Sequence, residues 1–224
     1  MKAVILAAGV GSRLGRPLPK CLSVLPTGET ILGRQIRIFR EVGIREIIVV
    51  VGFKKTLIME QHANVFFRYN PTFYITNTSK SLLHAVSDLD DDVLWTNGDV
   101  VFDSEVVRGV VEAKANVIAV DRKKCGDEEV KYCTGDAGTI VAISKNVTNG
   151  EGEAVGINKV MAEHVPSLVK NLELCEDQDY FERGLEFMIR EGVDFIPLDI
   201  SRHRCIEVDF PEDWNQAQEM FSRS

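Results

Sequence analysis

Short apolar runs along the chain alternate with segments whose apolar residues recur at helical spacing. Residues 4–6 form a short apolar run and residues 47–51 a continuous β-branched run, so each is expected to be a buried strand. Between them lies a helical pattern that begins after the N-capping residue Thr30 and ends at Gly43. Strands that alternate with helices in this way predict a parallel sheet with right-handed crossovers.

The remaining segments continue this alternation. Helices are expected at residues 54–61, 81–86, 104–114, 162–172, 179–191 and from Pro211 onward, and strands at 65–67, 92–96, 116–120, 155–159, 195–198 and 206–209. Two further runs, 130–134 and 139–144, flank a Gly-rich turn and predict an antiparallel hairpin. The large aromatic side chains are expected in the core, namely Trp95, Trp214, Phe39, Phe66 and Phe187.

These elements together predict the fold class and the domain organisation. We expect an α/β protein with a Rossmann-like three-layer α/β/α arrangement, a mostly parallel central sheet and an antiparallel hairpin insertion. The chain contains no internal repeat, low-complexity segment or linker. Residues 1–224 are therefore predicted to form a single domain.

Glycines and cations are concentrated in the turn that follows the first strand. Gly9 and Gly11 let the backbone turn tightly and approach a ligand closely, and successive N–H groups in such a turn form an anion-binding concavity. Arg13 and Lys20 add positive charge, and an arginine can bind a phosphate through two hydrogen bonds. We therefore predict that this turn binds phosphate groups.

Two common phosphate-binding loops do not fit this spacing. The phosphate loop of the nucleotide hydrolases ends in a Gly-Lys pair, and the sequence contains none. The dinucleotide fingerprint needs a third glycine three residues after the second, whereas Gly15 follows Gly11 by four residues. A dehydrogenase is therefore a weak alternative.

Charge and cysteine content narrow the class of partner. The net charge of −8 argues against a nucleic-acid partner, which normally requires a basic face, but not against a nucleotide in a locally charged pocket. Five cysteines without a C-x-x-C pair favour free thiols in a reducing cytoplasm over disulfides or a zinc site. The first apolar run stops at Gly9, which is too short for a signal peptide, so we expect no membrane insertion.

Two aspartates follow predicted strands, at the edge of the sheet where open α/β proteins bind ligands. Asp99 comes shortly after the strand at 92–96, and Asp209 comes just beyond the apolar residues of the last strand. Magnesium takes oxygen ligands and is usually held by one or two carboxylates together with substrate phosphates. With the phosphate-binding turn, the two aspartates predict a Mg²⁺ site.

These motifs resemble those of a known enzyme family. The segments 6–13, Pro19-Lys20 and Asn97-Gly98-Asp99 are similar to the nucleotidyltransferases that make nucleoside-diphosphate sugars and related activated alcohols. Further segments, at 70–78, 81–82, 120–122, 142–145, 155–157 and 207–209, look like the phosphocholine cytidylyltransferase branch, so the resemblance spans nearly the whole chain. The short stretch 14–18 departs from that branch and is more like the inositol-phosphate and molybdopterin-type enzymes, which leaves the acceptor open.

The resemblance implies a role for each matching residue. Arg13 and Lys20 would be catalytic by neutralising phosphate charge, and Asp99 and Asp209 would bind Mg²⁺. The nucleotide-binding residues would be Leu6, Ala7, Ala8, Gly9, Gly11, Ser12, Asn77, Thr78, Ser81 and Gly98. The acceptor, on the side of the hairpin, would meet Tyr74, Asp121, Lys145, Tyr180, Glu182 and Glu207. The rings of Tyr74 and Tyr180 are suited to a quaternary ammonium, because aromatic faces attract cations, although ordinary packing explains them equally well.

The implied reaction is Mg²⁺-dependent transfer of CMP from CTP to the phosphate or phosphonate of a small, phosphocholine-like acceptor, with release of pyrophosphate. Such an enzyme would be cytoplasmic, with a homodimer as one possible assembly, and would supply precursors of cell-surface polymers or lipids. One alternative is a sugar-1-phosphate or inositol-phosphate nucleotidyltransferase that uses UTP, dTTP, GTP or CTP. A nucleotide-binding module without catalysis is another, although the presence of Arg13, Lys20, Asp99 and Asp209 argues against it.

Overall fold

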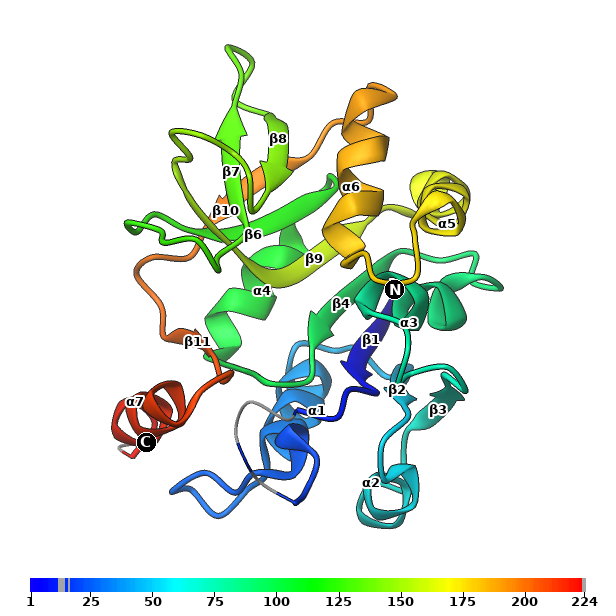
Figure 1. The fold of residues 1–224 in the computed structure, drawn as a ribbon, viewed down its shortest axis with the longest axis vertical. Coiled ribbons are helices and arrows are strands. Elements are labelled where there is room, and N and C mark those ends of the chain that lie inside the picture. The colour runs from blue at the N-terminus through cyan, green and yellow to red at the C-terminus, as the bar shows by residue number, and fades with distance from the viewer. Residues whose placement is uncertain (12–14, 16, 223–224) are drawn as a thin grey trace.

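Figure 1 shows the computed structural model of the protein, which describes residues 1–11, 15 and 17–222. The strands are β1 (Lys2–Ala7), β2 (Ile47–Val51), β3 (Phe66–Tyr69), β4 (Val93–Asn97), β5 (Val100–Phe102), β6 (Val117–Asp121), β7 (Lys131–Thr134), β8 (Ile140–Ser144), β9 (Gly152–Val160), β10 (Ile196–Asp199) and β11 (Cys205–Glu207). The helices are α1 (Ile31–Glu41), α2 (Lys55–Gln61), α3 (Thr78–Val86), α4 (Ser104–Glu112), α5 (Val165–Leu174), α6 (Phe181–Arg190) and α7 (Pro211–Met220), with short 3₁₀ turns η2 (Lys20–Leu22) and η3 (Ala162–His164).

The central sheet has the strand order β10-β6-β9-β4-β1-β2-β3, and the hairpin of β7 and β8 joins it through β9. Strand β1 pairs in parallel with β2 and β4, and β2 pairs in parallel with β3. Strand β10 is also parallel to β6, whereas β9 runs antiparallel to both β4 and β6. The predicted mostly parallel sheet with an antiparallel hairpin is confirmed.

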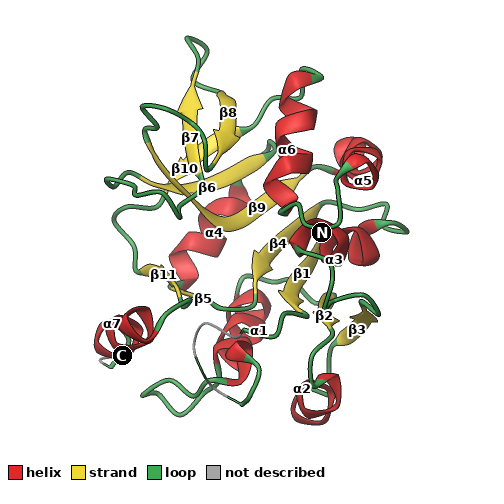
Figure 2. Cartoon of the chain, in the orientation of Figure 1, coloured by secondary structure: helices red, strands yellow, loops and turns green. Residues whose placement is uncertain are grey.

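Helices cover both faces of this sheet, which gives the three predicted layers (Figure 2). Along β1, Ala3 and Ile5 pack into a core that includes residues of α1, α2 and α4. Val4 and Leu6 point to the other face, into a core with residues of α3, α5 and α6. Because both faces are buried, the sequence of β1 is continuously apolar instead of alternating.

A third, smaller core holds the C-terminal segment against the rest of the molecule. Strands β5 and β11 pair antiparallel in a two-stranded sheet of their own. Val101 of β5 belongs to one apolar cluster with Val208, Trp214 and Phe221. This cluster fixes the segment between β11 and α7 beside the carboxyl end of β4.

Two arginines reinforce the attachment of the C-terminal segment. The guanidinium carbons of Arg34 and Arg204 lie 4.6 Å and 4.8 Å from the centre of the Phe221 ring. Both guanidinium groups also pair with Asp103, at N–O distances of 3.5 Å and 2.9 Å. Aromatic faces attract such cations, so the end of the chain is anchored through both apolar and charged contacts.

Several details differ from the sequence-based prediction. The pattern does not predict β5, because this strand has three residues and follows the turn after β4 directly. The helix expected at 162–172 is divided into η3 and α5, and Pro166 lies in the first turn of α5, where its missing N–H costs nothing. Phe66, expected in the core, is 61% exposed because it lies on β3 at the edge of the sheet.

The state of the cysteines agrees with the sequence-based expectation. All five cysteines are free thiols. Burial raises the pKa of Cys21 to about 12, so this thiol stays protonated at neutral pH. Within the part of the chain that the structure describes, no helix combines the length and the apolar character needed to cross a bilayer.

A buried glutamine connects helix α1 to the turn after β4. Gln35 Nε2 donates hydrogen bonds to the carbonyl oxygens of Asn97, at 2.9 Å, and Val100, at 2.7 Å. The turn between these two residues contains Gly98 and Asp99. The position of Asp99 therefore depends on a side chain from the opposite layer of the fold.

We expect Gln35→Leu to lower the free energy of unfolding by about 2 kcal/mol, because two buried carbonyls lose their donor. Urea denaturation measures this change. The control is Gln61→Leu, whose glutamine is exposed and should change stability by about 0.5 kcal/mol or less. A Gln35→Leu protein as stable as the control would contradict the assignment.

Candidate active site

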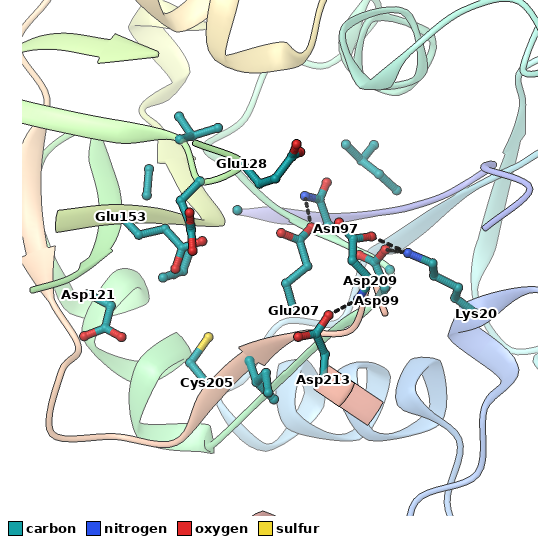
Figure 3. Close-up of a pocket in the computed structure, with 18 of the residues that line it drawn as sticks. Lys20, Asn97, Asp99, Asp121, Glu128, Glu153, Cys205, Glu207, Asp209 and Asp213 are labelled. Atoms are coloured by element: carbon teal, nitrogen blue, oxygen red, sulfur yellow. Dashed lines mark hydrogen bonds and ion pairs between the residues drawn. The ribbon is translucent and has the colours of Figure 1, made fainter. Parts of the chain in front are cut away.

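The carboxyl ends of β1 and β4 open into a cavity of about 880 Å³. Its walls come from the turns after these two strands, from β6 and β9, from the segments that flank the hairpin, and from the C-terminal segment. Figure 3 shows acidic side chains from several of these elements around the same space. The cavity thus lies where open α/β sheets bind their ligands.

Lys20 lies between two carboxylates that come from distant parts of the chain (Figure 3). Its Nζ is 3.3 Å from Oδ2 of Asp99 and makes a shorter contact with Oδ1 of Asp209. Burial lowers the pKa of Lys20, but the two aspartates raise it more, so the pKa lies above its usual value. Lys20 is therefore a cation, and two carboxylates share its single charge.

Asp99 is held in place by a tight turn that requires glycine at position 98. The Gly98 N–H donates a hydrogen bond of 2.9 Å to the carbonyl of Leu6, and a Cβ on Gly98 would lie 2.8 Å from that oxygen. Burial raises the pKa of Asp99, and the charge of Lys20 reduces this rise without cancelling it. The ionised Asp99 carboxylate therefore depends on a neighbouring cation.

Asp209 is positioned by the start of α7. The N–H of the preceding residue, Val208, donates a hydrogen bond of 3.0 Å to the Asp99 carbonyl, so the two segments lie side by side. Asp213 Oδ2 accepts hydrogen bonds from the N–H groups of Asp209, at 3.0 Å, and Phe210, at 2.7 Å. Phe210 is the N-cap of α7, so its N–H has no partner inside the helix, and the Asp209 N–H comes directly before it.

Glu207 adds a third carboxylate near the two aspartates. Asn97 Nδ2 donates a hydrogen bond of 3.1 Å to Glu207 Oε1 (Figure 3). The Asn97 side chain packs against Gly156, which has a φ of +71°. A Cβ at position 156 would lie 2.9 Å from Asn97 Nδ2, so a larger residue there would displace the amide. Desolvation and repulsion from Asp99 and Asp209 raise the pKa of Glu207 well above its usual value.

On the far side of the cavity, lysines are paired with carboxylates. Lys145 Nζ lies 3.4 Å from Glu128 Oε2 and 5.1 Å from the centre of the Tyr180 ring. Lys123 Nζ lies 2.6 Å from Glu153 Oε2. These pairs leave the far side without excess positive charge from either lysine.

Most of the predicted site residues line this one cavity. They are Lys20, Asp99 and Asp209; Leu6, Ala7, Gly9, Gly11, Asn77, Thr78 and Gly98; and Asp121, Lys145, Tyr180, Glu182 and Glu207. The predicted residues Ser12 and Arg13 lie outside the described residues. The fold thus brings predicted residues as far apart in sequence as Leu6 and Asp209, which are separated by 203 positions, to the same cavity.

Three predicted site residues lie away from the cavity lining. Ala8 is buried beneath it, and the Ser81 hydroxyl accepts a hydrogen bond of 3.1 Å from Asn70 Nδ2. Tyr74 is 68% exposed and packs edge-on against Phe73. The structure therefore does not bring Tyr74 and Tyr180 together into one aromatic pocket.

Several cavity residues were not singled out from the sequence, among them Glu153 and Asp213. Glu153 lies near the start of β9, just before the strand predicted at 155–159. Asp213 lies in the first turn of α7, four residues after Asp209. Its signal in the sequence is an acidic residue in the first turn of a predicted helix, which is typical of a group that caps free N–H donors.

The carboxylate pair fits a magnesium ion. Both aspartates direct an oxygen to one cationic group, so two hard oxygen donors converge on a single position. In residues 1–11, 15 and 17–222, no three His, Cys, Asp or Glu side chains are arranged as a complete metal site. Such an incomplete set suits Mg²⁺, which usually takes its other ligands from water and substrate phosphates.

Comparison with known proteins gives the family. A family model described as the MobA-like NTP transferase domain matches residues 3–172, which is more than half of the chain. The chain belongs to the MobA-like NTP transferase family. It is therefore an enzyme of the nucleotidyltransferase class, and the family predicted from its motifs is confirmed.

Two curated relatives and one solved structure describe its neighbours in this family. The CMP-5'-(3-aminopropyl)phosphonate synthase of Streptomyces rubellomurinus is 36% identical over 54% of this chain, and the match spans 21% of that relative. The UTP–glucose-1-phosphate uridylyltransferase AglF of Haloferax volcanii is 27% identical over 98% of this chain and 96% of its own. The structure of CTP:phosphocholine cytidylyltransferase from Streptococcus pneumoniae has a TM-score of 0.83 at 22% identity, covers 98% of both chains, and shows a shared fold.

The absence of a side chain at Gly11 leaves room for the Lys20 side chain, and this role can be tested. Gly11 and Gly15 both have a φ of +65°, but only at Gly11 would a Cβ collide with Lys20, at 2.6 Å from its Cγ. Both alanine variants incur a backbone cost of about 1 kcal/mol, whereas only Gly11→Ala displaces the lysine. We expect turnover in a steady-state assay to fall on the order of 10²-fold for Gly11→Ala, and much less for Gly15→Ala. Equal losses in the two variants would contradict this role.

Proposed function

We propose that this nucleotidyltransferase uses CTP and Mg²⁺ to transfer CMP to the phosphate or phosphonate group of a small acceptor, with release of pyrophosphate. The acceptor is phosphocholine-like in one respect: it joins that anionic group to a cationic end. A cytoplasmic location is proposed as well, because all five cysteines are free, as is usual in a reducing compartment.

The convergence of Lys20, Asp99 and Asp209 is the observation that carries the proposal. Nucleotidyl transfer requires compensation of the negative charge on a triphosphate and on an anionic acceptor. The described cavity lining has nine carboxylate side chains and five lysine or arginine side chains, so on its own it would repel both substrates. A divalent cation on the two aspartates would reduce this conflict, and Lys20, one of the five cations, lies beside the same two carboxylates.

The reaction needs no nucleophile from the protein. An oxygen of the acceptor phosphate or phosphonate is already anionic at neutral pH, and it attacks the α-phosphorus of CTP as pyrophosphate leaves. The residues of the chain act by positioning and by charge: Lys20 binds the phosphate on which charge develops, and backbone N–H groups at Gly9 and Gly11 bind the triphosphate. When bound, Mg²⁺ would supply further charge neutralisation at the phosphates and would be held by Asp99 and Asp209.

Backbone groups, instead of the Asn77 side chain, are expected to distinguish cytosine from uracil. Asn77 Oδ1 accepts a hydrogen bond of 2.8 Å from the Thr78 N–H, and its Nδ2 donates to the carbonyl of Gln178 at 3.3 Å. Each end of the amide thus already has one partner within the protein, and these two bonds fix its orientation. The choice of CTP is supported by the first relative, whose name specifies a CMP product.

The acidic far side of the cavity supports an acceptor with a cationic end. Asp121, Glu153 and Glu182 line this side of the cavity, while Lys123 is paired with Glu153 and Lys145 with Glu128. A neutral sugar would leave this excess of negative charge uncompensated. The names of the phosphonate relative and of the phosphocholine enzyme both specify an acceptor that contains nitrogen.

A sugar-1-phosphate uridylyltransferase is the second candidate function. It is favoured by the Haloferax volcanii relative, which matches this chain almost from end to end. Pyrophosphate release measured with the four NTPs, each with aminoalkyl phosphonates, aminoalkyl phosphates, inositol phosphate and glucose 1-phosphate, separates the two candidates. Activity only with UTP and glucose 1-phosphate would replace the proposal with this second function.

In a competition with equal CTP and UTP and the best acceptor, we expect CMP products to exceed UMP products by tenfold or more. Cytosine presents an amino donor where uracil presents a carbonyl, so a site that pairs with one leaves a buried polar group unpaired with the other. Such mismatches reach on the order of 10⁴-fold in enzymes. Mass spectrometry of the product mixture gives the ratio, and equal incorporation would remove the cytidylyltransferase assignment.

We expect Asp99→Asn and Asp209→Asn each to lower turnover and Mn²⁺ affinity on the order of 10²-fold while the protein stays folded. Each change removes a charged oxygen ligand and keeps the size of the side chain. Mn²⁺ binding is followed by electron paramagnetic resonance, and Asp136→Asn, in the exposed turn of the hairpin, is the control. Full activity of both site variants at limiting Mg²⁺ would end the metal assignment.

A further inference from the structure

Glu182 is a buried carboxylate with an oxygen that has no partner. Glu182 is 8% exposed, lies in the first turn of α6 and lines the cavity on the acceptor side. In the described part of the chain, Glu182 Oε2 finds no hydrogen-bond donor. A buried acceptor without a donor is unfavourable, and more so when the group is charged.

The charges around Glu182 also lack compensation. Glu153 and Glu207 line the same cavity as Glu182. Burial raises the pKa of Glu182 itself to about 7, and Lys145 lowers it only in part. A cation placed between Glu182 and Glu207 would therefore stabilise both carboxylates.

The ring of Tyr180, two residues before this carboxylate, is already in contact with a cation of the protein. The Tyr180 ring has the Lys145 ammonium 5.1 Å from its centre, and Lys145 also pairs with Glu128. Tyr74, the other ring considered for a quaternary ammonium, is exposed and lies away from the cavity lining. The far side thus offers carboxylate oxygens to a cation and lacks an open cage made by these two rings.

We propose that Glu182 selects an acceptor whose cationic end is a primary ammonium, and that it binds this ammonium by accepting an N–H hydrogen bond at Oε2. The inference rests on the proposed function and specifies the acceptor class for the same site. A primary ammonium has three N–H donors, one for Glu182 and others for neighbours such as Glu207. A trimethylammonium has no N–H, so it would leave Glu182 Oε2 buried without a partner.

The test is an acceptor series in which only the ammonium changes. We would measure kcat/KM with CTP for 2-aminoethyl and 3-aminopropyl acceptors that carry zero, one, two or three N-methyl groups, and for the neutral hydroxyl analogues. The anionic group is kept as the phosphate or phosphonate that the enzyme accepts. We expect kcat/KM to fall tenfold or more from the primary ammonium to the trimethyl compound, mainly through KM, with the neutral analogue also poor.

Two variants connect this preference to Glu182. Glu182→Gln keeps the size of the side chain and removes its charge, so it should raise KM for the primary ammonium tenfold or more. It should leave KM for the trimethyl compound nearly unchanged, which a general structural defect would not do. Glu173→Gln is the control, because Glu173 is exposed on α5 away from the cavity lining, and it should keep the wild-type order of acceptors.

The outcomes separate the inference from the proposed function. Equal or better use of the trimethyl compound, or an unchanged acceptor order in Glu182→Gln, would overturn the role of Glu182 and leave CMP transfer intact. If neither variant folds like the wild type, isothermal titration of the wild-type enzyme with the same acceptors still decides the order of affinity. Use of hexose 1-phosphates and of none of the ammonium acceptors would contradict both the inference and the proposed function.

Discussion

The ion contact between Lys20 and the carboxylates of Asp99 and Asp209 is the interaction on which the rest of the site depends. It joins the segment after the first strand, the turn after β4 and the segment before the last helix. Without the ammonium, two carboxylates with Glu207 beside them would repel one another in a partly buried place. The proposed Mg²⁺ would be held by the same two carboxylates, whose charge Lys20 balances in this structure.

Much of the surrounding structure keeps these three groups in position. Gln35 holds the turn of Asp99 from helix α1, and Asp213 holds the backbone of Asp209 from helix α7. Gly11 leaves room for the stem of Lys20. A third core and the stacking of Arg34 and Arg204 on Phe221 keep the C-terminal segment in place. The charge cluster is thus local, but the contacts that maintain it extend into helices α1 and α7 and the C-terminal segment.

The sequence predicts the features that depend on local pattern and misses those that depend on distant contacts. The strand Ile47–Val51 and the cap of α1 at Thr30 follow from periodicity and from a side-chain hydrogen bond, and both are confirmed. Lys20, Asp99 and Asp209 were predicted from motifs, and the fold brings them together. Phe66 is exposed because β3 forms an edge of the sheet, and Tyr74 lies away from the cavity because of how its loop packs. A local sequence pattern contains no information about either arrangement, nor about the short strand β5. The unpartnered oxygen of Glu182 is visible only once α6 is packed against the cavity.

Isotope labelling shows directly whether the α-phosphorus of CTP is transferred to the acceptor. The enzyme would be incubated with Mg²⁺, an aminoalkyl phosphonate and CTP labelled with ³²P at either the α or the γ position, and the products separated by chromatography. The account predicts that the α label enters the acceptor product and that the γ label leaves as pyrophosphate. Transfer of the γ label to the acceptor, or retention of both labels in CTP with every acceptor class supplied, would contradict it.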